Sequence, residues 1–122
     1  MKELNGLKGD GFEIIPVAGL KEVMLRWVGR VNVANPPKLL DPYLHTLLWK
    51  TKGRSILIDF THLYSANPST FYSVLRFFRN SSAMKIEVRV QYDFNSEWQT
   101  AMFRSLEIVT ERLPGITILR ID

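Results

Sequence analysis

Apolar residues recur along the chain with two periods, and each period predicts a different kind of element. Alternating or continuous apolar stretches over residues 12–17 and 23–31 are typical of β-strands. The short segment between them predicts an antiparallel hairpin, and Pro16 places its first strand near a sheet edge because proline cannot donate a ladder hydrogen bond. Residues 1–11 are rich in glycine and charge, so we expect a flexible N-terminal lead before a domain over residues 12–122.

Helical spacing of apolar residues occurs in three stretches. Asn35 and the prolines after it predict the start of a helix that runs to about Lys50, with an irregular start or a kink at Pro42. Residues 68–79 form a second amphipathic stretch. Ser96 and Gln99 have the spacing of a capping box before a third helix. The apolar stripe of this third helix is predicted to comprise Trp98, Met102, Phe103, Leu106 and Val109.

Three further strands are predicted between and after these helices. Residues 55–60 are almost continuously apolar, which is typical of a central strand buried on both faces. Residues 85–92 alternate, as a strand with one polar face does, and residues 116–121 form the last strand. The order of elements predicts a single α/β domain with a mixed, mostly parallel sheet of about five strands covered by helices.

Composition narrows the functional classes. Among 122 residues there are no cysteines, which excludes disulfides, thiol nucleophiles and cysteine metal sites, and the two histidines have no partners at metal-ligand spacing. No glycine-rich phosphate loop follows a strand, so we expect no enzyme activity, no cofactor and no metal. The net charge of +4 is dispersed, and no long apolar run exists. We therefore expect a cytoplasmic protein that binds neither nucleic acid nor membrane.

The most informative stretch follows the central strand, over residues 59–71. Ligands and partners of open α/β sheets gather at the carboxyl ends of strands, and this stretch leads from such an end into a helix. If Asn67 caps that helix, Ser69 and Thr70 lie in its first turn, where free N–H groups favour a phosphate. The same residues also make an ordinary helix start without any regulatory role. Asp59 is open to two interpretations as well: a site carboxylate, or a cap for the following loop.

The whole-chain layout and this stretch resemble the STAS domain, the fold of bacterial anti-sigma-factor antagonists. Residues 28–35 are similar to the family's strand that ends in Gly-Arg before a helix, and residues 57–60 are similar to its buried strand with an aspartate. The family's phosphorylation loop falls on residues 67–70. The segment 64–70 and the pair Trp98 and Gln99 also resemble atypical bacterial STAS-like proteins.

The resemblance implies a non-enzymatic signalling switch. The phosphoacceptor maps to Ser69, and Thr70 offers a second hydroxyl. The implied partner is a serine kinase or anti-sigma factor with the histidine-kinase-like ATPase fold, which phosphorylation releases, and a metal-dependent serine phosphatase would reset the switch. The residues expected to contact the partner surround this loop: Asp59, His62, Tyr64, Ser65, Asn67 and Tyr72. Tyr72 is expected to be exposed, and Phe71 to belong to the core.

Two other functions stay open at this point. The loop departs from the family pattern at Asn67, Pro68 and Thr70, so the chain is alternatively a constitutive binding or scaffold module without phosphoregulation. The other alternative is a binder of small ligands, or a minor enzyme, that uses Asp59 and His62 in a pocket at the strand ends. The protein is expected to be a monomer or a weak dimer.

Overall fold

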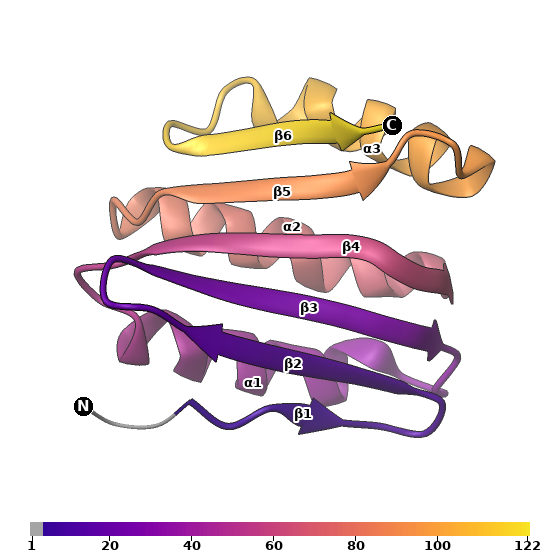
Figure 1. Cartoon of the computed structure of the whole chain (residues 1–122), viewed down its shortest axis with the longest axis horizontal. Helices are drawn as coiled ribbons and strands as arrows, with labels where there is room; N and C mark the ends of the chain where they lie inside the picture. The colour runs from indigo at the N-terminus through magenta and orange to yellow at the C-terminus, as the bar shows by residue number, and fades with distance from the viewer. Residues whose placement is uncertain (1–3) are drawn as a thin grey trace.

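The computed structural model describes residues 4–122 and shows one six-stranded sheet in the order β1-β2-β3-β4-β5-β6 (Figure 1). The first three strands are antiparallel neighbours, and β3 to β6 run parallel. The predicted fold class is confirmed, with six strands in place of about five. The elements are β1 (Leu7–Lys8), β2 (Phe12–Ala18), β3 (Glu22–Val31), α1 (Pro36–Lys50), β4 (Ser55–Ala66), α2 (Pro68–Ala83), β5 (Val88–Asp93), α3 (Glu97–Thr110) and β6 (Ile116–Ile121).

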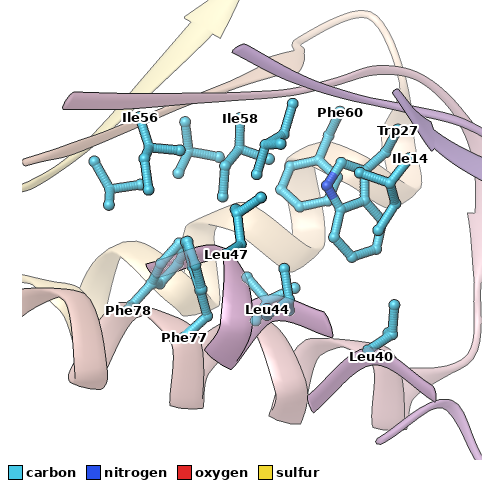
Figure 2. Close-up of a cluster of buried hydrophobic side chains, with 14 of the residues drawn as sticks. Ile14, Trp27, Leu40, Leu44, Leu47, Ile56, Ile58, Phe60, Phe77 and Phe78 are labelled. Atoms are coloured by element: carbon cyan, nitrogen blue, oxygen red, sulfur yellow. The ribbon is translucent and has the colours of Figure 1, made fainter. Parts of the chain in front are cut away.

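All three helices lie on one face of the sheet, where the core is formed (Figure 1). Figure 2 shows the strand side chains Ile56, Ile58 and Phe60 pointing toward leucines of α1 and toward Phe77 and Phe78 of α2. The third helix joins the same layer because Phe103 of α3 packs against Phe60 with ring centroids 5.2 Å apart. The core is therefore a single layer between the sheet and its helices.

The opposite face of the sheet is not covered by any helix within residues 4–122 (Figure 1). In β3 to β5 it carries the strand residues that alternate with the core positions. Register places Arg26 beside Asp59, and Asp59 beside Gln91. Met24 and Leu57 form a more apolar row next to these polar residues. We call this surface the open face.

The expectation of a flexible lead over residues 1–11 is wrong for the part that the structure describes, residues 4–11. Leu4 is buried, and β1 pairs with β2 through Leu7 and Lys8. The glycines that suggested flexibility serve close packing, since a Cβ at Gly9 would lie 2.1 Å from the Phe12 ring. Residues 1–3 lie outside the described part of the chain.

Several predicted boundaries and faces need correction. The first helix is continuous through Pro42, the second extends to Ala83, and β5 begins at Val88, after a turn in which Lys85 takes a positive φ of 58°. In α3, Val109 is 42% exposed, contrary to the predicted apolar stripe. The buried face is rotated toward Gln99, Phe103, Leu106 and Thr110. The polar residues at its two ends hid this face from a reading of hydrophobicity alone.

Candidate functional site

The stretch that the sequence assigned to a loop, residues 61–66, continues strand β4. Opposite Arg26 and Val28 of β3 lie Asp59 and His62, so β4 has an extra residue there. A second extra residue lies between Leu63 and Ser65, which face Gly29 and Arg30. Such β-bulges change which side chains face outward, and they are common next to functional sites.

The bulges determine which side chains of β4 reach solvent. Before them, Phe60 points into the core, and after the first bulge it is Leu63 that is buried. His62 lies beside Val28 on the open face and is exposed, and Ser65 lies beside Arg30. Tyr64 is 71% exposed. An unbulged strand would alternate strictly from Phe60 and would turn His62 and Tyr64 into the core.

Gln99 of α3 supports the bulged segment from below. Its side-chain Nε2 donates to the carbonyl oxygens of Phe60 at 2.8 Å and Leu63 at 2.9 Å. Its Oε1 accepts the backbone N–H of Asp93 at 2.8 Å. The pairing of β4 with β5 stops at Asp59, so these backbone groups have lost the neighbouring strand that would otherwise bind them. The fully buried Gln99 side chain thus takes the place of backbone hydrogen bonds between β4 and β5 beyond Asp59.

Half of the predicted capping box is present at this helix. The Ser96 hydroxyl accepts the N–H of Gln99 at 3.5 Å, as a cap does. The Gln99 side chain does not bond the backbone N–H of Ser96, as it would in a capping box, but bonds backbone groups of β4 and β5. Sequence spacing identified the residue, yet its structural task depends on strands that are distant in the sequence.

Asp59 lies on the open face, where its side chain is almost fully buried by its neighbours. The Thr61 hydroxyl and backbone N–H donate to Oδ1 at 2.6 and 2.9 Å, and the Arg26 Nε lies 3.5 Å from Oδ2. Burial opposes ionisation, but the hydrogen bonds from Thr61 and Gln91, together with the charge of His62, outweigh it and lower the pKa of Asp59. Asp59 is therefore an ionised group whose hydrogen bonds with Thr61 hold the local conformation of β4. Little of its carboxylate is available to a partner.

The start of α2 is fixed by Asn67, although not by side-chain capping. Its side-chain amide donates to the Val33 carbonyl at 2.8 Å, and its backbone N–H donates to Val31 at 2.9 Å. The predicted cap is corrected in this respect, since no cap hydrogen bond from the Asn67 side chain is made. The residue instead ties the start of α2 to the segment that follows β3.

The two predicted phosphoacceptors differ in accessibility. Ser69 is half-buried at the second position of the 16-residue helix α2. Thr70 is fully buried, and its hydroxyl has no hydrogen-bond partner. The Ser69 side chain is therefore partly accessible in the folded chain, whereas that of Thr70 is reached only by local opening.

The structure divides the predicted partner-binding residues between two layers. Tyr72 lies in α2 and is 63% exposed, as expected, and Phe71 is buried. Asn67, Ser69 and Tyr72 belong to the helix layer, whereas His62 and Ser65 lie on the open face. A partner that contacts both groups has to straddle the end of the sheet where β4 runs into α2. We call this region the junction surface, comprising His62, Tyr64, Ser65, Ser69 and Tyr72.

Comparison with known proteins identifies the fold. No family model and no curated protein matches the sequence. Among solved structures, the unphosphorylated anti-sigma factor antagonist SpoIIAA superposes with a TM-score of 0.61 at 14% identity, over 91% of this chain and 89% of that one. The chain has a STAS-like fold.

A second solved structure supports the STAS-like assignment. A DUF3478-family protein with a SpoIIAA-like fold, from Shewanella loihica, superposes with a TM-score of 0.53 at 17% identity. The alignment covers 98% of this chain and 90% of that one. At these identities the likeness concerns the fold, so the site depends on the geometry described above.

Sequence reasoning missed several residues that shape this region of the fold. Gly29 adopts a φ of 91°, and a Cβ on it would lie 2.2 Å from the Gly11 carbonyl oxygen, so only glycine fits. Arg26 and Arg30 bring positive charge to the open face beside Asp59 and Ser65. The Gly-Arg pair carries the resemblance in the sequence, but the sequence does not reveal that Gly29 and Arg30 contact the Gly11 carbonyl between β1 and β2. Within residues 4–122 there is no cluster of three potential metal ligands, and no helix is long and apolar enough to cross a membrane.

Proposed function

We propose that this protein is a non-enzymatic signalling switch that binds a protein partner through the junction surface and is regulated by phosphorylation of Ser69. The single observation that carries the proposal is the position of Ser69, which is half-buried in the first turn of α2 and three residues before the exposed Tyr72 of the same helix. Tyrosines are enriched at protein interfaces because they combine a large apolar ring with a polar tip. The STAS-like fold of SpoIIAA supports the same class of function.

A phosphate on Ser69 would act in two ways. The positive end of the helix dipole stabilises an anion at the first turn of α2, where Pro68 has no N–H and the Thr70 N–H donates to the Asn67 carbonyl. The same phosphate adds a charge of about −2 to a surface that otherwise contributes hydroxyl and aromatic groups. A partner that contacts this surface through apolar or acidic groups is then released, because its contacts with the dianion are repulsive or poorly solvated.

Thr70 is withdrawn from the proposed set of phosphoacceptors. Its side chain is fully buried beneath the first turn, and a phosphate has no room there without opening the helix start. Asp59 and Asn67 act in the proposal as positioning residues, since each is engaged in hydrogen bonds within the fold.

The proposed partner is a serine kinase or anti-sigma factor with the histidine-kinase-like ATPase fold, and a serine phosphatase restores the unmodified state. The setting is the cytoplasm, where such kinases and ATP are present. The protein itself then needs no cofactor, because the kinase supplies the nucleotide.

Phosphomimetic and non-phosphorylatable variants of Ser69 test the switch. The wild-type chain, Ser69→Asp and Ser69→Ala are each used as bait in lysate of the native cells, and bound proteins are quantified by mass spectrometry. Ser105→Asp is the matched control, because it adds the same charge at an exposed site on α3. A switch predicts that one partner is lost with Ser69→Asp and retained with Ser69→Ala and Ser105→Asp.

The second candidate is a constitutive binding module of the same fold. It is favoured by Pro68, which has no N–H to offer to a phosphate in the first turn. It predicts that Ser69→Asp and Ser69→Ala bind the partner equally well. Small-ligand binding finds less support, because neither the hollow of about 210 Å³ between α1 and α2 nor the larger one of about 330 Å³ beside Tyr43 is lined by Asp59 or His62.

A further inference from the structure

The two edges of the sheet differ in how well their backbone N–H and C=O groups are protected from pairing with another chain (Figure 1). At one edge β1 pairs with β2, and the Phe12 carbonyl accepts the Gly9 N–H on that side. Pro16 directs its backbone nitrogen to the same side, where it has no hydrogen to donate. At the other edge, β6 is bordered by β5 alone within residues 4–122. Exposed edge strands without such protection tend to pair with another chain.

The backbone groups that β6 offers can be assigned from its pairing with β5. The Val88 N–H donates to the Gly115 carbonyl, and the Phe94 N–H donates to the Ile121 carbonyl. Odd-numbered residues of β6 thus turn their backbone toward β5, and even-numbered residues turn theirs outward. The Ile116 N–H is used locally, by the Leu113 carbonyl. The outward donors are therefore the N–H groups of Ile118 and Arg120, and the acceptors include the carbonyls of Ile116 and Ile118.

The side chains along this edge are largely apolar. On the open face of β6, Leu119 is 37% exposed and Ile121 is 42% exposed. On the outer side of α3, which packs against β5 and β6, Ile108 is 72% exposed and Val109 is 42% exposed. The strand itself contains no proline and a single charged residue, Arg120. Arg120 is therefore the one residue of β6 that belongs to the charged or proline residues by which edge strands usually avoid pairing.

We propose that β6 pairs antiparallel with β6 of a second copy, about a twofold axis that passes beside Ile118. In this register the Ile118 N–H of each copy donates to the Ile118 carbonyl of the other, and the Arg120 N–H donates to the Ile116 carbonyl. Every outward donor of the strand then has an acceptor, which makes the edge complementary to itself. The register also keeps the two Arg120 side chains apart, whereas a twofold axis at Leu119 would bring them to diagonal positions.

The size of the contact sets its strength. A strand of six residues is much shorter than the roughly 20–30 residues that each partner contributes to a standard interface. The pairing therefore gives a weak dimer that depends on protein concentration. It leaves the junction surface free, because that surface lies where β4 meets α2 and not at β6.

Sedimentation velocity over a concentration series tests the pairing. The wild-type chain is expected to shift from monomer to dimer as its concentration rises. Ile118→Pro removes an outward N–H but no hydrogen bond to β5, so it is expected to fold and to remain monomeric. Leu119→Lys is expected to weaken the dimer as well, and Val17→Lys is the matched control at the opposite edge, where the side chain is 53% exposed.

A cysteine cross-link tests the register. The chain contains no cysteine, and residues that face each other in a hydrogen-bonded antiparallel pair have Cα atoms about 5.5 Å apart, within the range of a disulfide. Ile118→Cys is expected to form a covalent dimer under copper phenanthroline oxidation, and Val17→Cys is not. A wild-type chain that stays monomeric up to about 1 mM overturns the proposal. So does a dimer that is no weaker in Leu119→Lys than in the wild type, and this result decides the matter even if Ile118→Pro fails to fold.

Discussion

Replacement of Gln99 by leucine perturbs the support of the bulged strand while keeping a side chain of similar size. The wild-type amide bonds three backbone groups, namely the carbonyls of Phe60 and Leu63 and the N–H of Asp93. Leucine can bond none of them. Because Gln99 is 1% exposed, water has no ready access to the groups that lose their partner.

The magnitude follows from the cost of leaving buried polar groups unpaired. Each such group costs about 1–3 kcal/mol, and the apolar leucine recovers part of this through its own burial. We expect Gln99→Leu to lower the free energy of unfolding by about 3–5 kcal/mol. That is a large fraction of the total for a domain of this length, which is of the order of 5–15 kcal/mol.

Urea unfolding followed by circular dichroism and by tryptophan fluorescence, to which the buried Trp27 contributes, measures this loss. Arg104→Leu, at an exposed position of the same helix, is the matched control and is expected to change stability by no more than about 0.5 kcal/mol. Hydrogen exchange adds a local readout, because amides of residues 60–66 should lose protection before the rest of the sheet. A Gln99→Leu variant within about 1 kcal/mol of the wild type would refute the role assigned to this side chain.

The remaining predictions concern three other positions. Gly29→Ala should destabilise the protein by several kcal/mol more than Gly53→Ala in thermal or urea unfolding, because both glycines have positive φ but only Gly29 has backbone within 3.0 Å of the added Cβ; equal losses would contradict this steric argument. Because the pKa of Asp59 is lowered from 3.8, its contribution to stability is complete above the unfolded value and is lost as pH falls through the folded value. Asp59→Asn should therefore reduce the dependence of the unfolding free energy on pH below about pH 4, and an unchanged slope would count against an ionised Asp59. Thr70→Val should leave stability unchanged or raise it by about 1 kcal/mol, because the buried hydroxyl has no partner; a loss above about 1 kcal/mol would show that this hydroxyl is bonded in solution.

The fold class was predictable because most elements follow their local hydrophobic period. The hairpin of β2 and β3, the buried strand at residues 55–60 and the three helices all have patterns that their neighbours reinforce. The elements that were not predicted are those without a hydrophobic period of their own. The two-residue strand β1 is too short to show alternation, and its glycines look like flexibility although they permit close packing.

The candidate site was predictable in position but not in geometry. Asp59, near the end of the predicted strand, and the helix start at Asn67 could be located from sequence, since turn and capping residues mark this stretch, but β4 itself continues to Ala66. The bulges between them could not, because an extra residue in β4 is defined only against the register of β3. The role of Gln99 could not be predicted either, because its side chain bonds strand carbonyls that lie 36 and 39 residues earlier in the chain.

The central claim, a switch at Ser69, is tested most directly by intact-mass measurement and phosphopeptide mapping of the protein isolated from its native cells under growth and stress conditions. The account predicts one added phosphoryl group on Ser69 that changes with conditions, and none on the buried Thr70. A chain that is unmodified at Ser69 under every condition, or modified only at residues outside the junction surface, would contradict the switch.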